Sequence, residues 1–369
     1  MSLSRKKSKI KTDFLTALEW FWNGWGSAIH NLVFIVCGSA TTWITSKLLH
    51  NIGGLYNRAT ARIYLHPFTL HETEQYLLAN NIRWSHYETV ECYMVMGGIP
   101  YYLRQIDPSQ SYMQNIDRLF FAKKAVLWDV FHNLYRTLFS NAETYERIVE
   151  TLARKRIGLT RREIAQNTGL PANGSLTTML ENLADSDFIR LYNYYGSRKR
   201  DTLYQLADYY TLFYLHFIKD RHGLDEHFWT NTIDNPARRA WAGYAFEQVC
   251  KDHLAQVKRK LGIGAVLSQY SSWFGKNEDD RGAEIDLVIE RRDNVINLCE
   301  MKFSIKEFVI DKDYDMALRN KIGAFRYATK TANKALHLTF ITTYGVKQGM
   351  YSSIVQSQVT MDDLFEAVL

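Results

Sequence analysis

The sequence predicts an α/β protein of several domains, and three observations predict it. At 369 residues the chain is long for one domain, so two or three are expected. Short apolar runs typical of strands alternate with helical patterns near both ends of the chain. Between them, a helix–turn–helix pattern is followed by a hairpin pattern. We therefore expect domains at residues 1–140, 141–210 and 211–369.

Composition is that of a globular protein, with 46% hydrophobic and 23% charged residues. A net charge of +6 is compatible with a polyanionic partner, although the bias is mild. The four cysteines show no CxxC spacing and indicate reduced, buried thiols. The longest apolar run, LVFIVC, is too short to span a membrane, and the basic N-terminus lacks a hydrophobic region. These features predict a cytoplasmic protein with no membrane partner.

The first part of the chain predicts an α/β layer. An amphipathic helix is expected over Lys11–Trp25, followed by a buried strand in NLVFIVCGSA and a helix over Thr42–His50. RIYLHPF is typical of a second strand, stopped by Pro67. Thr69 with Glu72 three residues later predicts the capped start of the next helix. From residue 85 to residue 153 the pattern is helical throughout.

Several segments here resemble the second half of an archaeal-type, AAA-related ATPase domain of the signal-transduction type. They are FLTALEWFWNGWG, VCGSA, LYNRAT, YLHPFTLHET and GGIPYYL. The resemblance implies a partial P-loop-type α/β domain with a helical lid. It also implies nucleotide-sensing roles for Ser39, at the end of a core strand, and Arg58, near the phosphates or a neighbouring subunit. It leaves a homo-oligomer open.

The phosphate loop of that family and its following acidic strand are missing, and no GxxxxGK[ST] occurs in the sequence. Without the loop, no ring of backbone N–H groups cradles the phosphates and no lysine reaches them. The sequence therefore looks N-terminally truncated. ATP belongs to the full-length family, and we expect this chain neither to hydrolyse ATP nor to bind it tightly.

Residues 141–210 form a second unit. GLTRREIAQNTGL predicts a helix that begins after Thr160 and turns at Gly169, SLTTMLENLADSDFI predicts a second helix, and a hairpin follows. The order resembles a winged helix–turn–helix, in whose DNA-binding members the second helix enters the major groove. That helix is polar here but not basic. Phosphate-seeking charge comes only from Arg161, Arg162 and the hairpin tip, which carries Arg198, Lys199 and Arg200. Winged helices also serve as packing modules, so both roles stay open.

The C-terminal part contains the hairpin that carries the chemistry. AEIDLVIE and VINLCEMKF are runs of alternating apolar residues on either side of RRDN. Alternation predicts Ile285, Leu287 and Ile289 on one face. Folding the hairpin sets Asp286 opposite Glu300, with Cβ atoms about 4.5–5.5 Å apart. Two carboxylates that close raise one another's pKa unless a cation lies between them, and a divalent metal is the natural cation.

Asp286 followed by Glu300-Met301-Lys302 resembles the PD-(D/E)xK nuclease core, with Ile285 in place of the usual proline. The resemblance implies a restriction-endonuclease-like α/β/α domain. It implies Mg²⁺ or Mn²⁺ bound by Asp286 and Glu300, with Lys302 orienting or activating the attacking water. A helix ahead of the core often supplies one more acid, and GYAFEQVC offers Glu247 as a catalytic and metal-binding residue.

Three functions compete at this point. The first is a magnesium-dependent phosphodiesterase that hydrolyses DNA, in a fragment of an AAA-type ATPase fused to the nuclease. The second is a non-catalytic regulatory assembly with a degenerate nuclease fold. The third is a DNA-binding regulator of transcription. All four nuclease positions are filled, which favours the first, whereas the missing phosphate loop favours the second.

Overall fold

The structure, a computed structural model, describes residues 16–38, 58–197, 201–221, 224–276 and 282–368. The chain divides into two compact units, Met1–Leu65 and His66–Leu369.

In the first unit the expected helix is present, because residues 16–24 are helical and are followed by the short 3-10 turn η1 (Gly26–Ala28). The two expected strands are wrong. Residues 32–38 and 61–68 have no regular structure, and side chains such as Val33 (82%) and Leu65 (91%) are largely exposed. A strand needs a neighbour to satisfy its backbone groups, and no described strand pairs with either run. A P-loop-type sheet is therefore not found among the described residues. The helix expected over 42–50 lies outside them.

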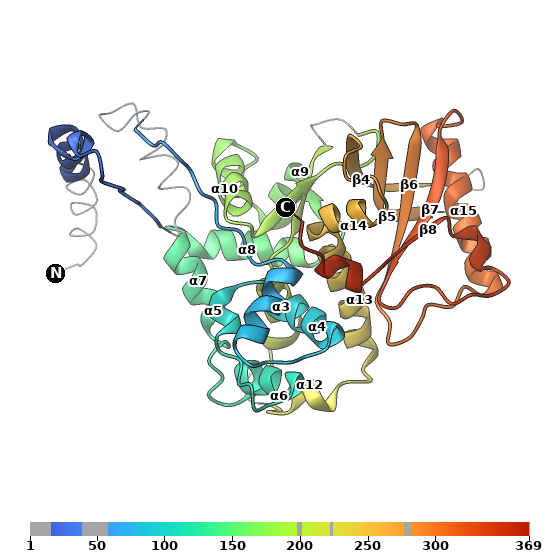
Figure 1. The fold of residues 1–369 in the computed structure, drawn as a ribbon, viewed down its shortest axis with the longest axis horizontal. Coiled ribbons are helices and arrows are strands. Elements are labelled where there is room, and N and C mark those ends of the chain that lie inside the picture. Colours follow the sequence, from blue (N-terminus) through green and yellow to red (C-terminus); the bar gives the residue numbers. More distant parts are fainter. Residues whose placement is uncertain (1–15, 39–57, 198–200, 222–223, 277–281, 369) are drawn as a thin grey trace. The chain divides into compact units, whose positions relative to one another are not determined.

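The second unit begins with a helical region, as expected (Figure 1). It comprises α3 (Leu70–Ala79), α4 (His86–Met96), α5 (Pro100–Leu103), α6 (Tyr112–Ile116), the π-helical turn η3 (Asp117–Phe121), α7 (Val130–Leu138) and α8 (Ala142–Ala153). Thr69 and Glu72 form the predicted capping box at the start of α3, and Ser85 with Glu88 forms another on α4. These short-range exchanges satisfy backbone N–H groups that the helix leaves free.

The middle region has the predicted order of elements. A short strand β1 (Leu159–Thr160) precedes α9 (Arg161–Thr168) and α10 (Gly174–Asp185), and the strands β2 (Ile189–Tyr192) and β3 (Leu203–Leu206) follow. They form an antiparallel sheet in the order β1-β3-β2. Thr160 caps α9, and Gly169 ends it in the left-handed region at φ +69°, where glycine is favoured. Membership of the winged-helix class stays a prediction.

The C-terminal region is a mixed α/β domain. Its helical part consists of α11 (Tyr209–Phe213), η5 (Tyr214–Ile218), α12 (Phe228–Asn231), α13 (Pro236–Asp252) and α14 (Leu254–Lys260). The remainder consists of β4 (Ser268–Lys276), β5 (Gly282–Arg291), β6 (Val295–Lys302), α15 (Lys312–Thr329), β7 (Ala335–Thr342), η6 (Ser352–Ile354), β8 (Ser357–Thr360) and η7 (Asp362–Phe365). The strands form one sheet in the order β4-β5-β6-β7-β8. Strands β4, β5 and β6 are antiparallel, and β6, β7 and β8 are parallel.

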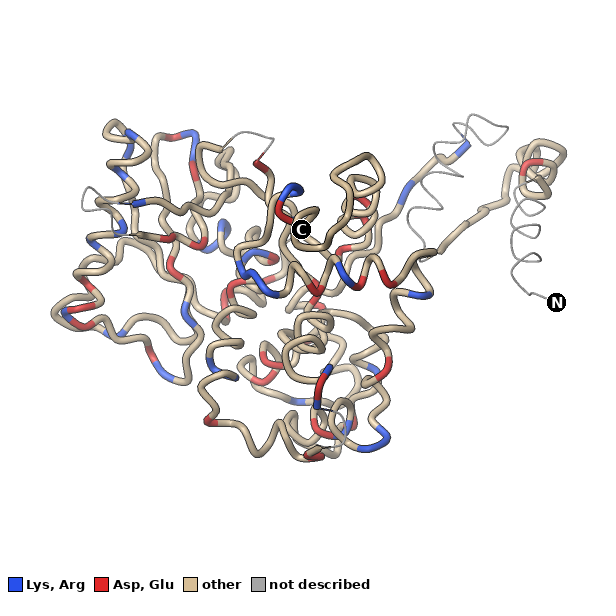
Figure 2. Tube along the Cα trace, turned by 180° about the vertical axis from the view of Figure 1, so that it is seen from behind, with Lys and Arg blue, Asp and Glu red and all other residues tan. Residues whose placement is uncertain are grey.

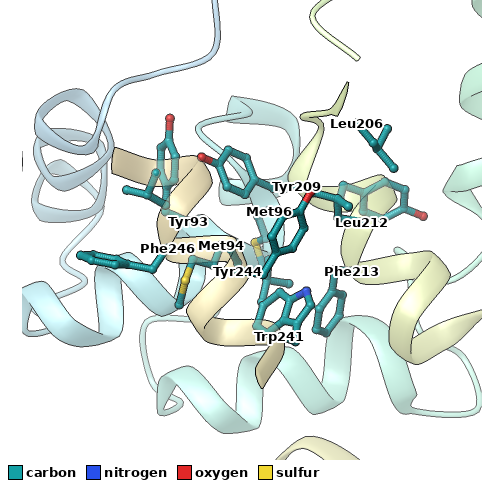
Figure 3. Packing of buried hydrophobic residues seen from close by; sticks show 14 of the residues in the cluster. Tyr93, Met94, Met96, Leu206, Tyr209, Leu212, Phe213, Trp241, Tyr244 and Phe246 are labelled. Carbon is teal, nitrogen blue, oxygen red and sulfur yellow. The ribbon is translucent and has the colours of Figure 1, made fainter. Parts of the chain in front are cut away.

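Helices pack against both faces of this sheet (Figure 1). Leu287, Ile289 and Met301 share one apolar cluster with α13, which contributes Phe246 and Val249. On the other face, sheet residues pack with α15 in two smaller clusters that include Ile285, Val288, Leu298, Phe340, Leu318 and Phe325. The larger cluster continues into the helical region, where Met94 and Met96 lie among aromatic side chains (Figure 3). No helix among the described residues has the length and apolar character needed to cross a membrane.

Strand β5 is irregular where it carries Asp286. Ser271 pairs with Val288 and Trp273 with Ile285, so two residues of β5, Asp286 and Leu287, lie opposite one residue of β4. Such a β-bulge changes the direction of side chains on the bulged strand. The expectation that Ile285 shares a face with Leu287 and Ile289 is therefore wrong, because Ile285 packs with the α15 clusters.

Candidate functional site

Glu300 lies at the centre of a dense charge network on β6, and only 3% of it is exposed. Lys302 Nζ is 2.8 Å from Oε1 and Lys321 Nζ is 2.9 Å from Oε2. Tyr314 Oη donates a hydrogen bond of 2.6 Å to Oε1. Burial opposes ionisation of this carboxyl, but the charges of Lys302 and Lys321 outweigh burial, so the pKa of Glu300 lies below its usual value. Glu300 is thus held as a carboxylate.

Lys302 is in turn held as a cation. Burial lowers the pKa of a lysine, yet the neighbouring Glu300 charge and hydrogen bond raise the pKa of Lys302 above its usual value. A protonated lysine donates hydrogen bonds and accepts none. In this geometry Lys302 can stabilise negative charge but cannot remove a proton.

The register of β5 and β6 follows the prediction as far as Leu287, which pairs with Cys299. Asp286 is the next residue of β5, at the bulge, and its pairing with Glu300 stays a prediction. Burial, and then the charge of Glu300, raises the pKa of Asp286, while Lys251, Lys321 and Lys302 act in the opposite direction. The expected repulsion between the two carboxyls is therefore present.

Glu247 reaches the same network from α13. Asn235 caps this helix and Pro236 begins it, and its buried neighbours Phe246 and Cys250 anchor it on the sheet. Burial, and then the charge of Asp286, raises the pKa of Glu247 to about 8. The structure thus brings Glu247, Asp286, Glu300 and Lys302 into one electrostatic group.

Four further members of this group were missed from the sequence: Glu284, Lys251, Tyr314 and Lys321. Burial and the charge of Asp286 raise the pKa of Glu284. Lys251 follows Glu247 by one helical turn, and Tyr314 and Lys321 are seven residues apart on α15, so each pair shares a helix face. The spacing of each pair could have predicted that its two side chains share a helix face. No pattern within either helix indicated which strand that face would pack against.

The donor set fits a small divalent cation in part. In the described part of the chain, no group of three or more His, Cys, Asp or Glu residues is arranged to hold a metal ion. Mg²⁺, however, commonly uses only one or two carboxylates and completes its shell with water and substrate phosphate. Asp286 and Glu247 supply such a pair, whereas both oxygens of Glu300 are already engaged by Lys302, Tyr314 and Lys321.

The residues expected to contact DNA are only partly described. Arg161 and Arg162 are exposed at the start of α9, and Arg161 Nη1 donates a 3.1 Å hydrogen bond to Thr177 on α10. Arg198, Lys199 and Arg200 lie outside the described residues. Along the described residues from 66 to 368, basic and acidic residues alternate along the trace rather than forming one long basic stretch (Figure 2).

The segment after β2 packs against the edge of the large sheet. Tyr195 donates a 2.8 Å backbone hydrogen bond to the Ser272 carbonyl of β4, and its hydroxyl donates to Glu290 at 3.0 Å. On β2, Arg190 donates a 2.9 Å hydrogen bond to Gln248 of α13. One side of the hairpin therefore serves the internal interface, which supports the packing role for this module.

The described residues include only one of the two predicted nucleotide-sensing positions. Ser39 lies outside the described residues, and Arg58 is exposed in a segment without regular structure. Both roles stay predictions.

Two comparisons with known proteins bear on this chain. Residues 214–312 match the DUF234 family, described as archaeal and bacterial proteins of unknown function. An uncharacterized protein of Methanocaldococcus jannaschii is 23% identical over 294 residues, which cover 78% of this chain and 64% of that protein. The chain thus spans less than two thirds of the length of this relative. The family match extends from η5 through Glu247, Asp286, Glu300 and Lys302 to the start of α15.

Proposed function

We propose that this chain is a divalent-cation-dependent phosphodiesterase that hydrolyses DNA, with Glu247, Asp286, Glu300 and Lys302 as its site. The observation that carries the proposal is the pair Asp286 and Glu247. Burial raises the pKa of both residues; the charge of Asp286 raises the pKa of Glu247 further, and the charge of Glu300 raises that of Asp286, next to a lysine–glutamate pair on the neighbouring strand. Burying two like charges costs free energy unless they bind a cation, so such an arrangement is a candidate for function rather than for stability.

Asp286 and Glu247 would hold the cation in this proposal. When bound, a divalent cation polarises a phosphoryl oxygen and lowers the pKa of bound water. Lys302 then places its ammonium beside the negative charge that develops on the phosphate. Lys321 matters here, because it neutralises Glu300 from the α15 side and leaves Lys302 able to turn toward substrate.

Incubation of the purified protein with single- and double-stranded DNA and Mg²⁺ or Mn²⁺ tests this function. We expect cleavage that requires the cation and is lost in Asp286→Asn. Lys302→Ala should retain cation binding while cleavage falls by about 10²-fold or more, because an electrostatic contact to the developing charge is gone. Cleavage that is equally fast in the parent and in Asp286→Asn would exclude this site.

A non-catalytic regulatory role is the second candidate, and a specific observation favours it. Glu300 already has cationic and hydroxyl partners at both oxygens, which is the state of a satisfied structural carboxylate. This alternative predicts no cleavage with either cation and no change of stability on adding one.

ATP binding is expected to be weak, because the phosphate-cradling loop is absent from the sequence. Calorimetric titration of the full chain with Mg-ATP should show a dissociation constant well above the micromolar range. A sub-micromolar value would overturn this expectation and would show that other residues hold the phosphates.

A further inference from the structure

A cavity of about 470 Å³ opens between the end of α8, η5 and α13, and the proposed catalytic residues do not line it. Its volume lies within the range of small-molecule sites, which extends from about 300 to 1,000 Å³. Its walls are of two kinds. Leu212, Leu215, Trp241 and Tyr244 supply apolar and aromatic surface, and the remaining lining side chains are mostly charged.

The charged wall contains two arginines without an acidic partner. Lys219 is paired with Glu150 at 2.7 Å, and the adjacent Lys155 is paired with Glu163 at 3.0 Å. For Arg154 and Arg156, which are both exposed, no ion pair is found within the described ranges. Since Lys219 neutralises Glu150, Asp220 is the one lining carboxylate left to offset the two arginines. The cavity therefore carries a net positive charge, which favours an anionic ligand.

The apolar wall also carries an unused polar atom. Trp241 is 5% exposed, and its indole Nε1 has no hydrogen-bond partner among the described residues. Figure 3 shows this nitrogen on the side of the ring next to Phe213, and Trp241 is itself a lining residue. A buried donor without a partner costs free energy, but neighbouring atoms cover this nitrogen, so a ligand in the cavity would meet the face of the Trp241 ring rather than this atom.

Arg156 connects this cavity with the acidic site. It lies over the ring of Tyr244, with Cζ 5.4 Å from the ring centroid. Its charge also reaches Glu247 and Glu284, whose ionisation it favours. Tyr244 is one turn before Glu247 on α13, so the cavity and the acidic site adjoin along one helix.

We propose that this cavity binds one nucleotide unit, with its phosphate at Arg154 and Arg156 and its base against the apolar wall of Leu212, Leu215 and Tyr244. Arginine forks suit phosphate oxygens, and one flat ring with a sugar is compatible with the volume. The unit is either a free mononucleotide or the 5′-phosphorylated end of a strand. Binding of a strand end rests on the proposed function, because it would lead a DNA strand past Glu247. Binding of a free mononucleotide does not rest on the proposed function.

Calorimetric titration of the full chain in EDTA tests this without any divalent cation. The probes are AMP, adenosine, inorganic phosphate, and short oligothymidylates with and without a 5′-phosphate. We expect AMP to bind at least about ten-fold more tightly than adenosine or phosphate, because charged hydrogen bonds and ring contact act together. Binding of AMP and of the phosphorylated oligomer assigns the cavity to the nucleotide in either form. Binding of the phosphorylated oligomer alone assigns it to the strand end.

Three variants distinguish binding in this cavity from general attraction of anions to a basic surface. The double variant Arg154→Gln with Arg156→Gln should weaken binding of the tightest probe by about ten-fold or more. Leu215→Trp keeps both arginines but fills the cavity, and should also abolish tight binding. Arg326→Gln, an exposed arginine on α15, is the matched control and should change nothing. The proposal is overturned if no probe exceeds inorganic phosphate in affinity, or if the double arginine variant binds as the parent does. EDTA removes the divalent cation on which DNA cleavage is proposed to depend. Failure of nucleotide binding in EDTA would therefore not contradict the proposed cleavage, and failure of cleavage would not contradict nucleotide binding.

Discussion

Mg²⁺ or Mn²⁺ in excess is expected to raise the melting temperature of the parent protein and to have no such effect on Asp286→Asn. Burial raises the pKa of Asp286 and of Glu247, and the charge of Asp286 raises the pKa of Glu247 further, so a bound cation offsets this cost only in the folded state. At a cation concentration 100 times the dissociation constant, the stabilisation is about 2.7 kcal/mol by mass action. Thermal unfolding followed by circular dichroism, with and without the cation, measures it.

A matched variant in the same hairpin controls for charge alone. Asp293 is an exposed residue of the turn, paired with Arg291. Asp293→Asn removes the same charge and should keep the full response to the cation. If the melting curves of the parent with and without Mn²⁺ coincide, the paired-carboxylate site is wrong and the proposed nuclease function falls with it.

The cation response should also depend on pH with a definite sign. The pKa of Glu247 is raised from 4.5 to about 8, so between these values the folded state holds a proton that the unfolded chain has released. The unfolded state then binds fewer protons, and stability without cation falls as pH rises from about 4.5 to 8. The cation binds the deprotonated pair, so its stabilisation should increase over the same window. A response that is constant between pH 5 and pH 8 would contradict the assignment of Glu247.

Glu300→Gln is expected to lower the free energy of unfolding by roughly 3 kcal/mol at pH 7, because it leaves Lys302 and Lys321 partly buried without their counter-ion. The pKa of Glu300 is lowered in the folded state. Its contribution is therefore complete above the unfolded value of about 4.5 and is lost as pH falls through the folded value. The difference in free energy of unfolding between the parent and Glu300→Gln should therefore become smaller below about pH 4.5.

Urea unfolding at several pH values measures this difference. Glu307→Gln, at an exposed position shortly after β6, is the matched control and should cost little. Equal stability of the parent and Glu300→Gln at pH 7 would mean that the two lysines find other partners. The network around Glu300 would then carry no stability.

The acidic hairpin is the part of the site that the sequence determined. Alternation on both sides of RRDN places the turn, and the strand period of two then gives the register in which Leu287 pairs with Cys299. The capped starts of α3 and α9 were predicted in the same way, because each depends on residues within one turn of the helix. Local pattern and local structure agree in all of these.

The expected N-terminal strands failed for the complementary reason. An apolar run such as 32–37 is compatible with a buried strand, but a strand exists only beside a partner that takes up its N–H and C=O groups. In the described residues neither run pairs with a strand, and side chains such as Val33, Ile63 and Leu65 are exposed. Strand propensity depends on neighbouring strands, and neither run has a neighbouring strand among the described residues.

The sequence by itself determined the hairpin, its register as far as Leu287 and Cys299, and the place of Lys302 beside Glu300. Only the tertiary structure decided the rest of the network. The bulge of β5 opposite Ser272 changes which face Ile285 takes. Packing of α15 against β6 brings Tyr314 and Lys321 onto Glu300, and packing of α13 brings Glu247 and Lys251 to Asp286. These contacts join residues 14 to 39 positions apart, and the free energy of packing whole helix faces, rather than any local pattern, sets them.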